Sequence, residues 1–364
     1  MRSRAAVMYG YNQPLVIEEI NVDPPKAGEV RVKMAAAGVC HSDLHVMHGV
    51  YQYPLPLVLG HEGAGVVESV GAGVTHVSPG DHVVLSWLPS CGACRSCLRD
   101  RPAICLDVDW VEGGRLRDGT GRFKCEDAEI YHYGASSTFA EYTVVPAQAA
   151  IKVDKSAPLT PLSLIGCAVT TGVGAVLNTA RVRKGDRVCI IGCGGVGLNA
   201  VQGARIAGAE TIIAIDMTDS KLRLAQELGA THTVNAADPR AFELIRDLTG
   251  GGVDFAFEAV GLPQTIEMAV SVLGKGGEAI LIGMSDPDLK TSVPPLDFLI
   301  NERGVRGSWY GSSRPATDFP LMVELYQSGK LKLDSMVTTR PLEEVNEAFA
   351  DLESGKPGRT VLLF

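Results

Sequence analysis

The sequence has no long apolar run, no excess of basic residues and no internal repeat or low-complexity stretch. No segment approaches the roughly 20 apolar residues of a membrane-spanning helix. The N-terminal stretch MRSRAAVMYGYNQPL has two arginines but no apolar stretch after them, which is not typical of a signal peptide. The formal net charge of −9 argues against nucleic acid or an anionic membrane as a main partner. We therefore expect a cytoplasmic globular protein whose thiols stay reduced.

The composition and the residue patterns predict two domains of an α/β protein. The chain has 364 residues, of which 46% are hydrophobic, enough for two cores. The first 150 or so residues hold short Val-rich runs broken by Gly and Pro, which favour an antiparallel, barrel-like β domain. After about Val169, strands alternate with helical segments of 10–15 residues, which indicates a doubly wound parallel sheet. The polar, Gly-rich stretch from Leu106 to Ser137 is predicted to be a long loop.

Four cysteines lie in the segment CGACRSCLRDRPAIC, at Cys91, Cys94, Cys97 and Cys105. They could form two disulfides, a four-thiolate metal site or a redox site with the pattern Cys-x-x-Cys. Nine cysteines in all, an odd number, and the expected cytoplasmic location weigh against disulfides. We find no role for Cys125, Cys189 or Cys193.

A dinucleotide fingerprint lies in the segment IIGCGGVGLNA. Gly192-x-Gly194-x-x-Gly197 follows an expected strand and opens an expected helix, where glycines allow a tight turn and close approach to a pyrophosphate. The next strand ends in Asp216, about 20 residues on, where an acid would accept the ribose hydroxyls. A helix start with packing glycines is the simpler alternative. An acid there favours NAD over NADP, because a carboxylate repels a 2′-phosphate.

Three residues are candidate ligands of a catalytic zinc, namely Cys40, His61 and Cys167. Catalytic zinc needs three protein ligands and one open position. The spacing alone is moderate evidence, since a lone histidine is more often a hydrogen-bonded residue and a lone cysteine more often a small buried hydrophobe.

Together these residues resemble the zinc-dependent medium-chain alcohol dehydrogenases along nearly the whole chain. The pattern Gly60-His61-Glu62-x-x-Gly65, followed by Gly71 and Val74, is similar to that family's zinc signature. CHSDLH, GHEGAG, the four-cysteine segment, LIGC, GCGGVG and GRTVLLF also occur in the family's order. The resemblance implies a GroES-like β-barrel catalytic domain over 1–169 and 310–364, with a Rossmann domain over 170–309.

The resemblance also implies two zinc ions per chain, NAD and a set of site residues. It places the catalytic zinc on Cys40, His61 and Cys167, and a structural zinc on the four cysteines, which leave no position for substrate. Ser42 and His45 match the family's proton relay, and Asp43 and Glu62 match the acids that support the zinc ligands. The implied contacts with the cofactor are His41, Thr171, Gly192, Gly194, Gly195, Val196, Gly197, Asp216, Lys221 and Arg359.

The substrate is the least determined part of this interpretation. Trp87 and Phe139 match positions that line the family's substrate channel, and we expect Tyr51, Trp110 and Met284 to join them, with core packing as the alternative for each. Such a bulky apolar pocket favours a primary aromatic or medium-chain alcohol. A thiol-adduct formaldehyde dehydrogenase and an enzyme that never releases its NAD stay open. The glutathione-dependent branch is disfavoured because no arginine follows Cys105 until Arg115. A homodimer is expected from the family.

Overall fold

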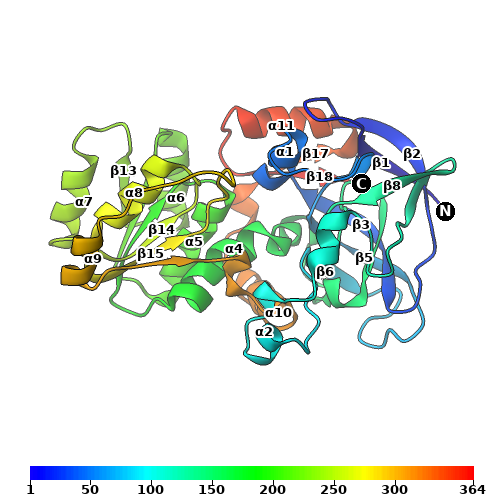
Figure 1. The fold of residues 1–364 in the computed structure, drawn as a ribbon, viewed down its shortest axis with the longest axis horizontal. Coiled ribbons are helices and arrows are strands. Elements are labelled where there is room, and N and C mark those ends of the chain that lie inside the picture. Colours follow the sequence, from blue (N-terminus) through cyan, green and yellow to red (C-terminus); the bar gives the residue numbers. More distant parts are fainter. The chain divides into compact units, whose positions relative to one another are not determined.

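The chain forms two compact units in this computed structural model, which describes all residues 1–364. Unit 1 comprises Met1–Cys167, Arg314–Gly329 and Leu333–Phe364. Unit 2 comprises Ala168–Ser313 and Lys330–Lys332. Figure 1 colours the chain from its N-terminus to its C-terminus, so the return of the last segments to unit 1 can be followed there.

A small closed barrel forms the first part of unit 1. Its strands, in spatial order, are β1 (Arg2–Met8), β2 (Val16–Val22), β7 (Phe123–Cys125), β8 (Ala128–His132) and β4 (Leu57–Val58). Apolar side chains of these strands fill one core, in which Phe123, Ile130 and Phe139 are fully buried. The predicted barrel-like β domain is therefore confirmed.

A seven-stranded sheet completes unit 1. Its order is β10 (Ala150–Lys152), β6 (His82–Leu85), β5 (Glu62–Val70), β3 (Glu29–Gly38), β18 (Arg359–Leu363) and β17 (Val337–Pro341), with β9 (Tyr142–Pro146) paired to β3. Strand β18 pairs antiparallel with β3 through Leu363↔Ala36 and its neighbours. The end of the chain is thus an inner strand of this sheet. The helices of unit 1 are α1 (His41–Met47), α2 (Arg95–Leu98), α3 (Leu159–Leu162), α10 (Pro315–Gln327) and α11 (Val345–Glu353).

The prediction of a long loop from Leu106 to Ser137 is wrong in part. The segment contains the hairpin β7–β8, which pairs Phe123 with Ile130. It also contains the short helix η2 (Asp109–Gly113). The alternation of apolar and polar residues that indicates a strand is hard to recognise here. Each strand of the hairpin is short, and Phe123 and Ile130 supply much of its buried face.

Unit 2 is a six-stranded parallel sheet with the strand order of dinucleotide-binding folds. The order is β13 (His232–Asn235), β12 (Thr211–Asp216), β11 (Arg187–Ile191), β14 (Val253–Glu258), β15 (Leu273–Leu281) and β16 (Gly304–Gly307). Numbered along the chain this is 3-2-1-4-5-6, the order that leaves a crevice beyond the carboxyl ends of β11 and β14. The strands are rich in Val and Ile because both faces of a parallel sheet are covered.

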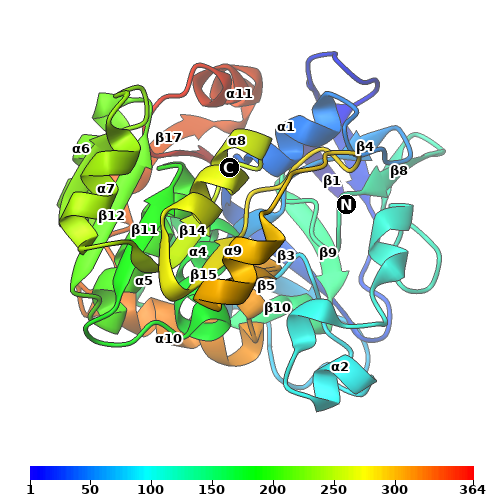
Figure 2. The ribbon, with the colours of Figure 1, turned by 60° about the vertical axis from the view of Figure 1, so that its left-hand side comes forward.

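Helices lie on both faces of this sheet, as Figure 2 shows. They are α4 (Ala168–Gly174), α5 (Gly195–Ala207), α6 (Asp219–Leu228), α7 (Ala241–Thr249), α8 (Pro263–Ser271) and α9 (Pro295–Asn301), with a π-helical turn at Ala175–Ala180 after α4. The doubly wound α/β architecture predicted from the alternating segments is confirmed.

No single helix of the chain is long and apolar enough to cross a membrane. One bent pair of helical segments, Leu159–Gly166 and Ala168–Ala180, passes that test by length and composition alone.

Candidate functional site

Asp43 organises the first candidate metal site from a fully buried position in α1. Its Oδ2 accepts a hydrogen bond from the backbone N–H of Cys40, the residue just before the helix, at 3.1 Å. Its Oδ1 accepts from the backbone N–H of Gly60 and from Nδ1 of His61, each at 3.1 Å. One carboxylate therefore fixes the backbone at Cys40 and the ring of His61, as partners of metal ligands commonly do.

The donor atoms fit a zinc ion. Because Nδ1 of His61 donates to Asp43, its Nε2 carries the lone pair, and this buried atom has no hydrogen-bond partner. The ligand atoms of Cys40, His61, Glu62 and Cys167 all lie within 4.8 Å of one another. Two thiols and an imidazole are ligands that zinc prefers. The structure thus brings together all three ligands predicted from the sequence.

Glu62 lies in the same cluster and pairs with Arg359. Nη2 of Arg359 donates to the Glu62 carboxylate at 2.7 Å and to the backbone carbonyl of Val39 at 2.7 Å. Burial raises the pKa of the Glu62 carboxyl to about 7, against the opposing charge of Arg359. The guanidinium is 95% buried, so it is held toward the metal cluster. A contact between Arg359 and a pyrophosphate stays a prediction.

The surroundings of Cys40 favour its ionised form. A hydrogen bond from Cys167, together with the charges of His61 and Arg359, holds the pKa of the Cys40 thiol well below its ordinary value despite burial. A thiolate is the form that binds a metal. The same cluster therefore supplies both the geometry and the charge state of a ligand.

The residues predicted to form a proton relay lie along α1. Ser42 is two residues from Cys40, and its Oγ is 3.8 Å from the Cys40 sulfur. His45 is half-buried, and its Nδ1 is buried without a hydrogen-bond partner. Burial lowers the pKa of His45, so the ring is neutral at pH 7 and able to accept a proton. His41, the predicted pyrophosphate contact, is exposed at the start of the helix.

Aromatic side chains surround His61. The Trp87 ring lies edge-on to the imidazole with its centroid at 6.5 Å. The Tyr133 ring lies edge-on at 5.5 Å, and the Tyr53 ring contacts Tyr133 at 5.1 Å. Trp87 was predicted from the sequence, whereas Tyr53 and Tyr133 were not. In the sequence, each of these tyrosines is simply an aromatic residue in a short segment near a motif. Its spacing alone does not distinguish it from a surface tyrosine.

Three further residues predicted to line a substrate pocket have different surroundings. Phe139 is wholly buried in the barrel core, where its ring contacts Phe349. This burial favours the alternative of core packing for Phe139, and its place in a substrate channel stays a prediction. Trp110 lies in η2, packs against the same core and donates from Nε1 to the carbonyl of Asp107 at 3.1 Å. Tyr51 lies 5.9 Å from the ring of His45.

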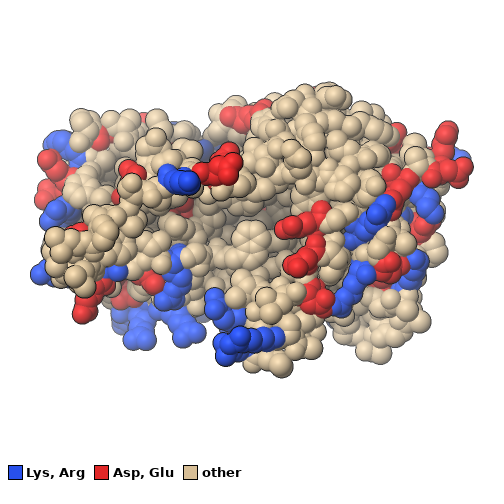
Figure 3. Space-filling model, viewed as in Figure 1, with Lys and Arg blue, Asp and Glu red and all other residues tan.

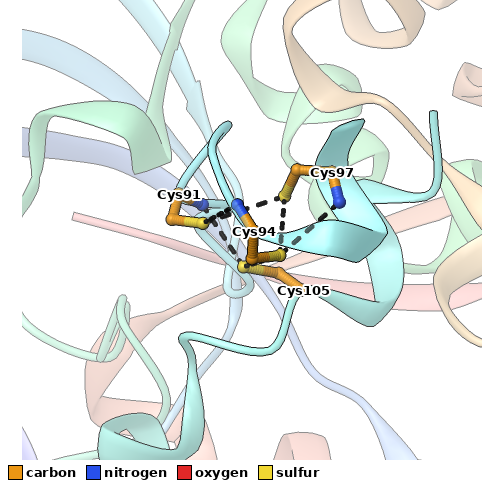
Figure 4. Close-up of side chains that lie close together, drawn as sticks. All are labelled: Cys91, Cys94, Cys97 and Cys105. Atoms are coloured by element: carbon orange, nitrogen blue, oxygen red, sulfur yellow. Dashed lines mark hydrogen bonds between the residues drawn. The ribbon is translucent and has the colours of Figure 1, made fainter. Parts of the chain in front are cut away.

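The four-cysteine lobe forms the second candidate metal site (Figure 4). The sulfur of Cys94 lies 3.5 Å from that of Cys97 and 3.8 Å from that of Cys105, and the sulfurs of Cys91 and Cys97 are 4.0 Å apart. Thiolates about 2.3 Å from a zinc ion lie about 3.8 Å from one another in a tetrahedron. All nine cysteines are free, and these sulfurs are too far apart for disulfides.

Backbone amides prepare this lobe for metal binding. The N–H groups of Ala93 and Cys94 donate to the sulfur of Cys91, and those of Cys97 and Leu106 to the sulfur of Cys94. The bonds from Cys97 and Leu106 lower the pKa of the Cys94 thiol to about 6. The lobe therefore fits a four-thiolate zinc site, with no open position.

The glycine fingerprint of unit 2 lies at the carboxyl end of β11. Gly192 has φ of +92°, and a Cβ there would meet Val260 at 2.5 Å. A Cβ on Gly197 would meet the carbonyl oxygen of Gly192 at 1.7 Å. Helix α5 begins at Gly195, with Gly194 as its N-cap and Val196 in its first turn. Side chains at Gly192 and Gly197 are thus excluded, as a tight phosphate-binding turn requires.

Asp216 stands at the end of β12, beside this turn. Its Oδ2 accepts from the backbone N–H of Cys193 at 2.8 Å, and its Oδ1 from that of Thr218 at 2.9 Å. Lys221 is half-buried in the first turn of α6. Thr171 lies in α4. Met284 follows β15, and its backbone carbonyl packs so closely on Gly261 that a Cβ at that glycine would clash with it. Asp216 and Lys221, both predicted to bind the cofactor, thus lie at the carboxyl end of β12 and in the helix that follows it. The glycine turn lies at the carboxyl end of the neighbouring strand β11.

Charged side chains of both signs are interspersed over the face drawn in Figure 3, without a continuous basic surface on it.

Two protein families match long stretches of this chain. Residues 26–155 match the alcohol dehydrogenase GroES-like domain family, and residues 195–328 match the zinc-binding dehydrogenase family. An alcohol dehydrogenase zinc-binding domain protein from Burkholderia ambifaria is 40% identical, covering 100% of this chain and 99% of its own, with a TM-score of 0.97.

Two further solved structures are also similar. Benzyl alcohol dehydrogenase from Acinetobacter calcoaceticus is 33% identical, covering 100% of this chain and 99% of its own, with a TM-score of 0.96. A zinc-binding dehydrogenase from Sinorhizobium meliloti 1021, solved bound to NADP, is 25% identical over 100% of both chains, with a TM-score of 0.82.

Proposed function

Since this chain belongs to the zinc-dependent medium-chain alcohol dehydrogenase family, we propose that it interconverts a primary aromatic or medium-chain alcohol and its aldehyde, with NAD as the hydride acceptor. The observation that carries this proposal is the buried cluster of Cys40, His61 and Cys167, bordered by the rings of Trp87 and Tyr133. Aromatic walls beside a metal site favour a substrate with apolar surface to bury. The similarity to a benzyl alcohol dehydrogenase supports the same substrate class.

Cys40, His61 and Cys167 would hold the catalytic zinc, with Asp43 fixing the ring of His61. When bound, zinc supplies a Lewis acid that makes a substrate hydroxyl more acidic and polarises a carbonyl. Ser42 would accept the hydroxyl proton at Oγ and release its own, and a ring nitrogen of His45 would accept the relayed proton and pass it toward solvent. The neutral imidazole of His45 suits that acceptor role.

Unit 2 would bind the cofactor. The pyrophosphate would lie on the N-terminus of α5, where backbone N–H groups and the helix dipole attract anions. Each carboxylate oxygen of Asp216 accepts one backbone hydrogen bond and keeps capacity for a ribose hydroxyl. We propose NAD although the Sinorhizobium meliloti neighbour was solved with NADP, because the negative charge of Asp216 opposes a 2′-phosphate.

The four-cysteine lobe would hold a second, structural zinc, giving two per chain. The sulfur spacing and the amides directed at the thiols support this assignment.

A homodimer is proposed through β16, the edge strand of the unit 2 sheet, because an unpaired edge is a liability. Helix α9, which precedes that strand, also exposes Leu296, Leu299 and Ile300.

The proposed function is tested by a substrate panel followed through NADH absorbance. We expect kcat/KM for benzyl alcohol and hexanol to exceed that for ethanol at least tenfold, because each added buried CH₂ contributes about 0.8 kcal/mol. Equal or greater efficiency with ethanol would contradict the substrate class, and absence of turnover with any alcohol would contradict the activity itself.

A further inference from the structure

The loop of residues 49–56, between α1 and β4, carries two tyrosines that reach the proposed active site. Tyr51 contacts the ring of His45 at a centroid distance of 5.9 Å. Tyr53 contacts the ring of Tyr133 at 5.1 Å, nearly perpendicular to it. Tyr133 in turn lies edge-on to the zinc-ligand candidate His61 at 5.5 Å. The position of this loop therefore affects both the proton relay and the wall beside the metal cluster.

The middle of the loop is held by the hydroxyl of Tyr11. This hydroxyl accepts a hydrogen bond from the backbone N–H of Tyr53 at 3.0 Å and donates one to the carbonyl of the same residue at 2.8 Å. The ends of the loop are held separately, by Val50 N–H donating to the His45 carbonyl and by Tyr131 N–H donating to the Pro56 carbonyl. Tyr11 thus supplies a two-bond tether at the point from which the Tyr53 ring projects.

Tyr11 is itself fixed against α1. The backbone N–H of Asn12 donates to the carbonyl of Met47, the last residue of α1, at 2.7 Å. A Cβ on Gly49 would lie 3.5 Å from the Tyr11 ring, so this ring packs against the start of the loop. The tether therefore fixes the position of the loop relative to α1, the helix that carries Ser42, Asp43 and His45.

We propose that Tyr11 is a positioning residue for substrate. Its hydroxyl sets the place of Tyr53, which supports Tyr133 beside His61 and so defines the width of the space for the substrate's apolar part. The proposal rests on the proposed function and deepens it. Substrates that carry a ring or a longer chain depend on this wall, whereas ethanol is too short to use it.

The tether is tested first without substrate. Tyr11→Phe keeps the ring and removes both hydrogen bonds, so amide hydrogen exchange in a peptide spanning 49–56 should quicken about tenfold, since two hydrogen bonds are lost. Tyr9→Phe is the matched control, because its hydroxyl bonds Glu18 at an exposed surface. Zinc content should equal that of wild type in both. Unchanged exchange in Tyr11→Phe would overturn the tether, whatever the substrate is.

Kinetics then test positioning. Tyr11→Phe should raise KM for benzyl alcohol about tenfold with kcat within about twofold, and should leave KM for ethanol unchanged, while Tyr9→Phe behaves as wild type. An equal change for both alcohols would indicate a general loss of structure and overturn the proposal. A wild type that prefers ethanol would contradict the substrate class instead, which separates the two failures.

A double-mutant cycle asks whether Tyr11 acts through Tyr53. Tyr53→Ala should also raise KM for benzyl alcohol, and adding Tyr11→Phe to it should change KM less than about twofold, because the ring that the tether positions is gone. Fully additive effects of the two substitutions would overturn this route of action.

Discussion

Asp216 uses both carboxylate oxygens on backbone amides of its own unit, one of them in the glycine turn. If it also accepts the adenosine ribose hydroxyls, these are charge-assisted bonds worth roughly 1.5–3 kcal/mol. Asp216→Gly should then weaken NAD binding about ten- to a hundredfold. It should improve NADP binding by removing a like charge, and fluorescence titration of both cofactors measures this.

The control for this prediction is Asp219→Asn, which alters an exposed acid in the first turn of α6. Zinc content should be unchanged in both variants. Unaltered NAD affinity in Asp216→Gly, or a wild type that prefers NADP, would show that the end of β12 is not the ribose site.

His132 gives the folded chain a specific sensitivity to acid. The residue is fully buried in β8, stacks on Phe123 and accepts from the backbone N–H of Arg122. Burial, and then the charge of Arg122, lowers the pKa of His132 to about 3. In the unfolded chain its pKa is about 6.5. The unfolded state therefore binds the proton first, and stability falls as pH drops from about 6.5 toward 3.

Lowering the pH from 7 to 5 should reduce the free energy of unfolding by about 2 kcal/mol through His132 alone. His132→Gln keeps an acceptor for Arg122 but does not titrate, so its loss of unfolding free energy between pH 7 and pH 5 should be smaller by that amount. Urea unfolding at the two pH values measures the difference. His232→Gln, at an exposed position, should lose as much as wild type, and an equal loss in His132→Gln would refute the prediction.

At the scale of elements, the four-cysteine lobe has little but its thiols to hold it. Leu98 and Leu106 are 76% and 63% exposed, and α2 has only four residues, none of them buried. Metal binding supplies the folding free energy of such small motifs, on the order of 10–16 kcal/mol in isolated peptides. Cys94→Ser should therefore yield insoluble or thermolabile protein.

Cys40→Ser should instead abolish turnover and lower the zinc content from two toward one per chain while the fold survives. Cys125→Ser is the control, since Cys125 lies in β7 outside both clusters. Elemental analysis and thermal unfolding distinguish the three variants. Wild-type stability and metal content in Cys94→Ser would disprove the structural role of the lobe.

Elements differ in how well the sequence predicts them. The parallel strands and helices of unit 2 have strong periodic patterns, and their alternation predicted the observed order of elements. The hairpin β7–β8 has three and five residues per strand, too few for a pattern to stand out. For the site, Cys40, His61 and Cys167 were found through motifs. Tyr53 and Tyr133 were missed because their role depends on ring geometry, which follows from packing alone.

At the scale of the whole molecule, assembly should depend on the exposed apolar surface of α9. Leu299 is 75% exposed there, and α9 directly precedes the edge strand β16 in the chain. If this surface is the dimer interface, light scattering should give the mass of two chains for wild type. Leu299→Asp should shift the mass toward one chain, because a buried, unpaired charge is costly.

Leu321→Asp, at an exposed position of α10, should leave the mass unchanged. A wild-type mass near four chains would refute the dimer, and an unchanged mass in Leu299→Asp would refute the interface.

The place of β18 between β3 and β17 has a consequence for synthesis on the ribosome. Glu62 is translated early. Its buried carboxylate pairs with Arg359, which lies on β18 and is translated 297 residues later. The backbone N–H of Val39, beside Cys40, likewise waits for the carbonyl of Thr360. The candidate metal cluster therefore lacks these contacts in the nascent chain until β18 has been synthesised and has paired with β3.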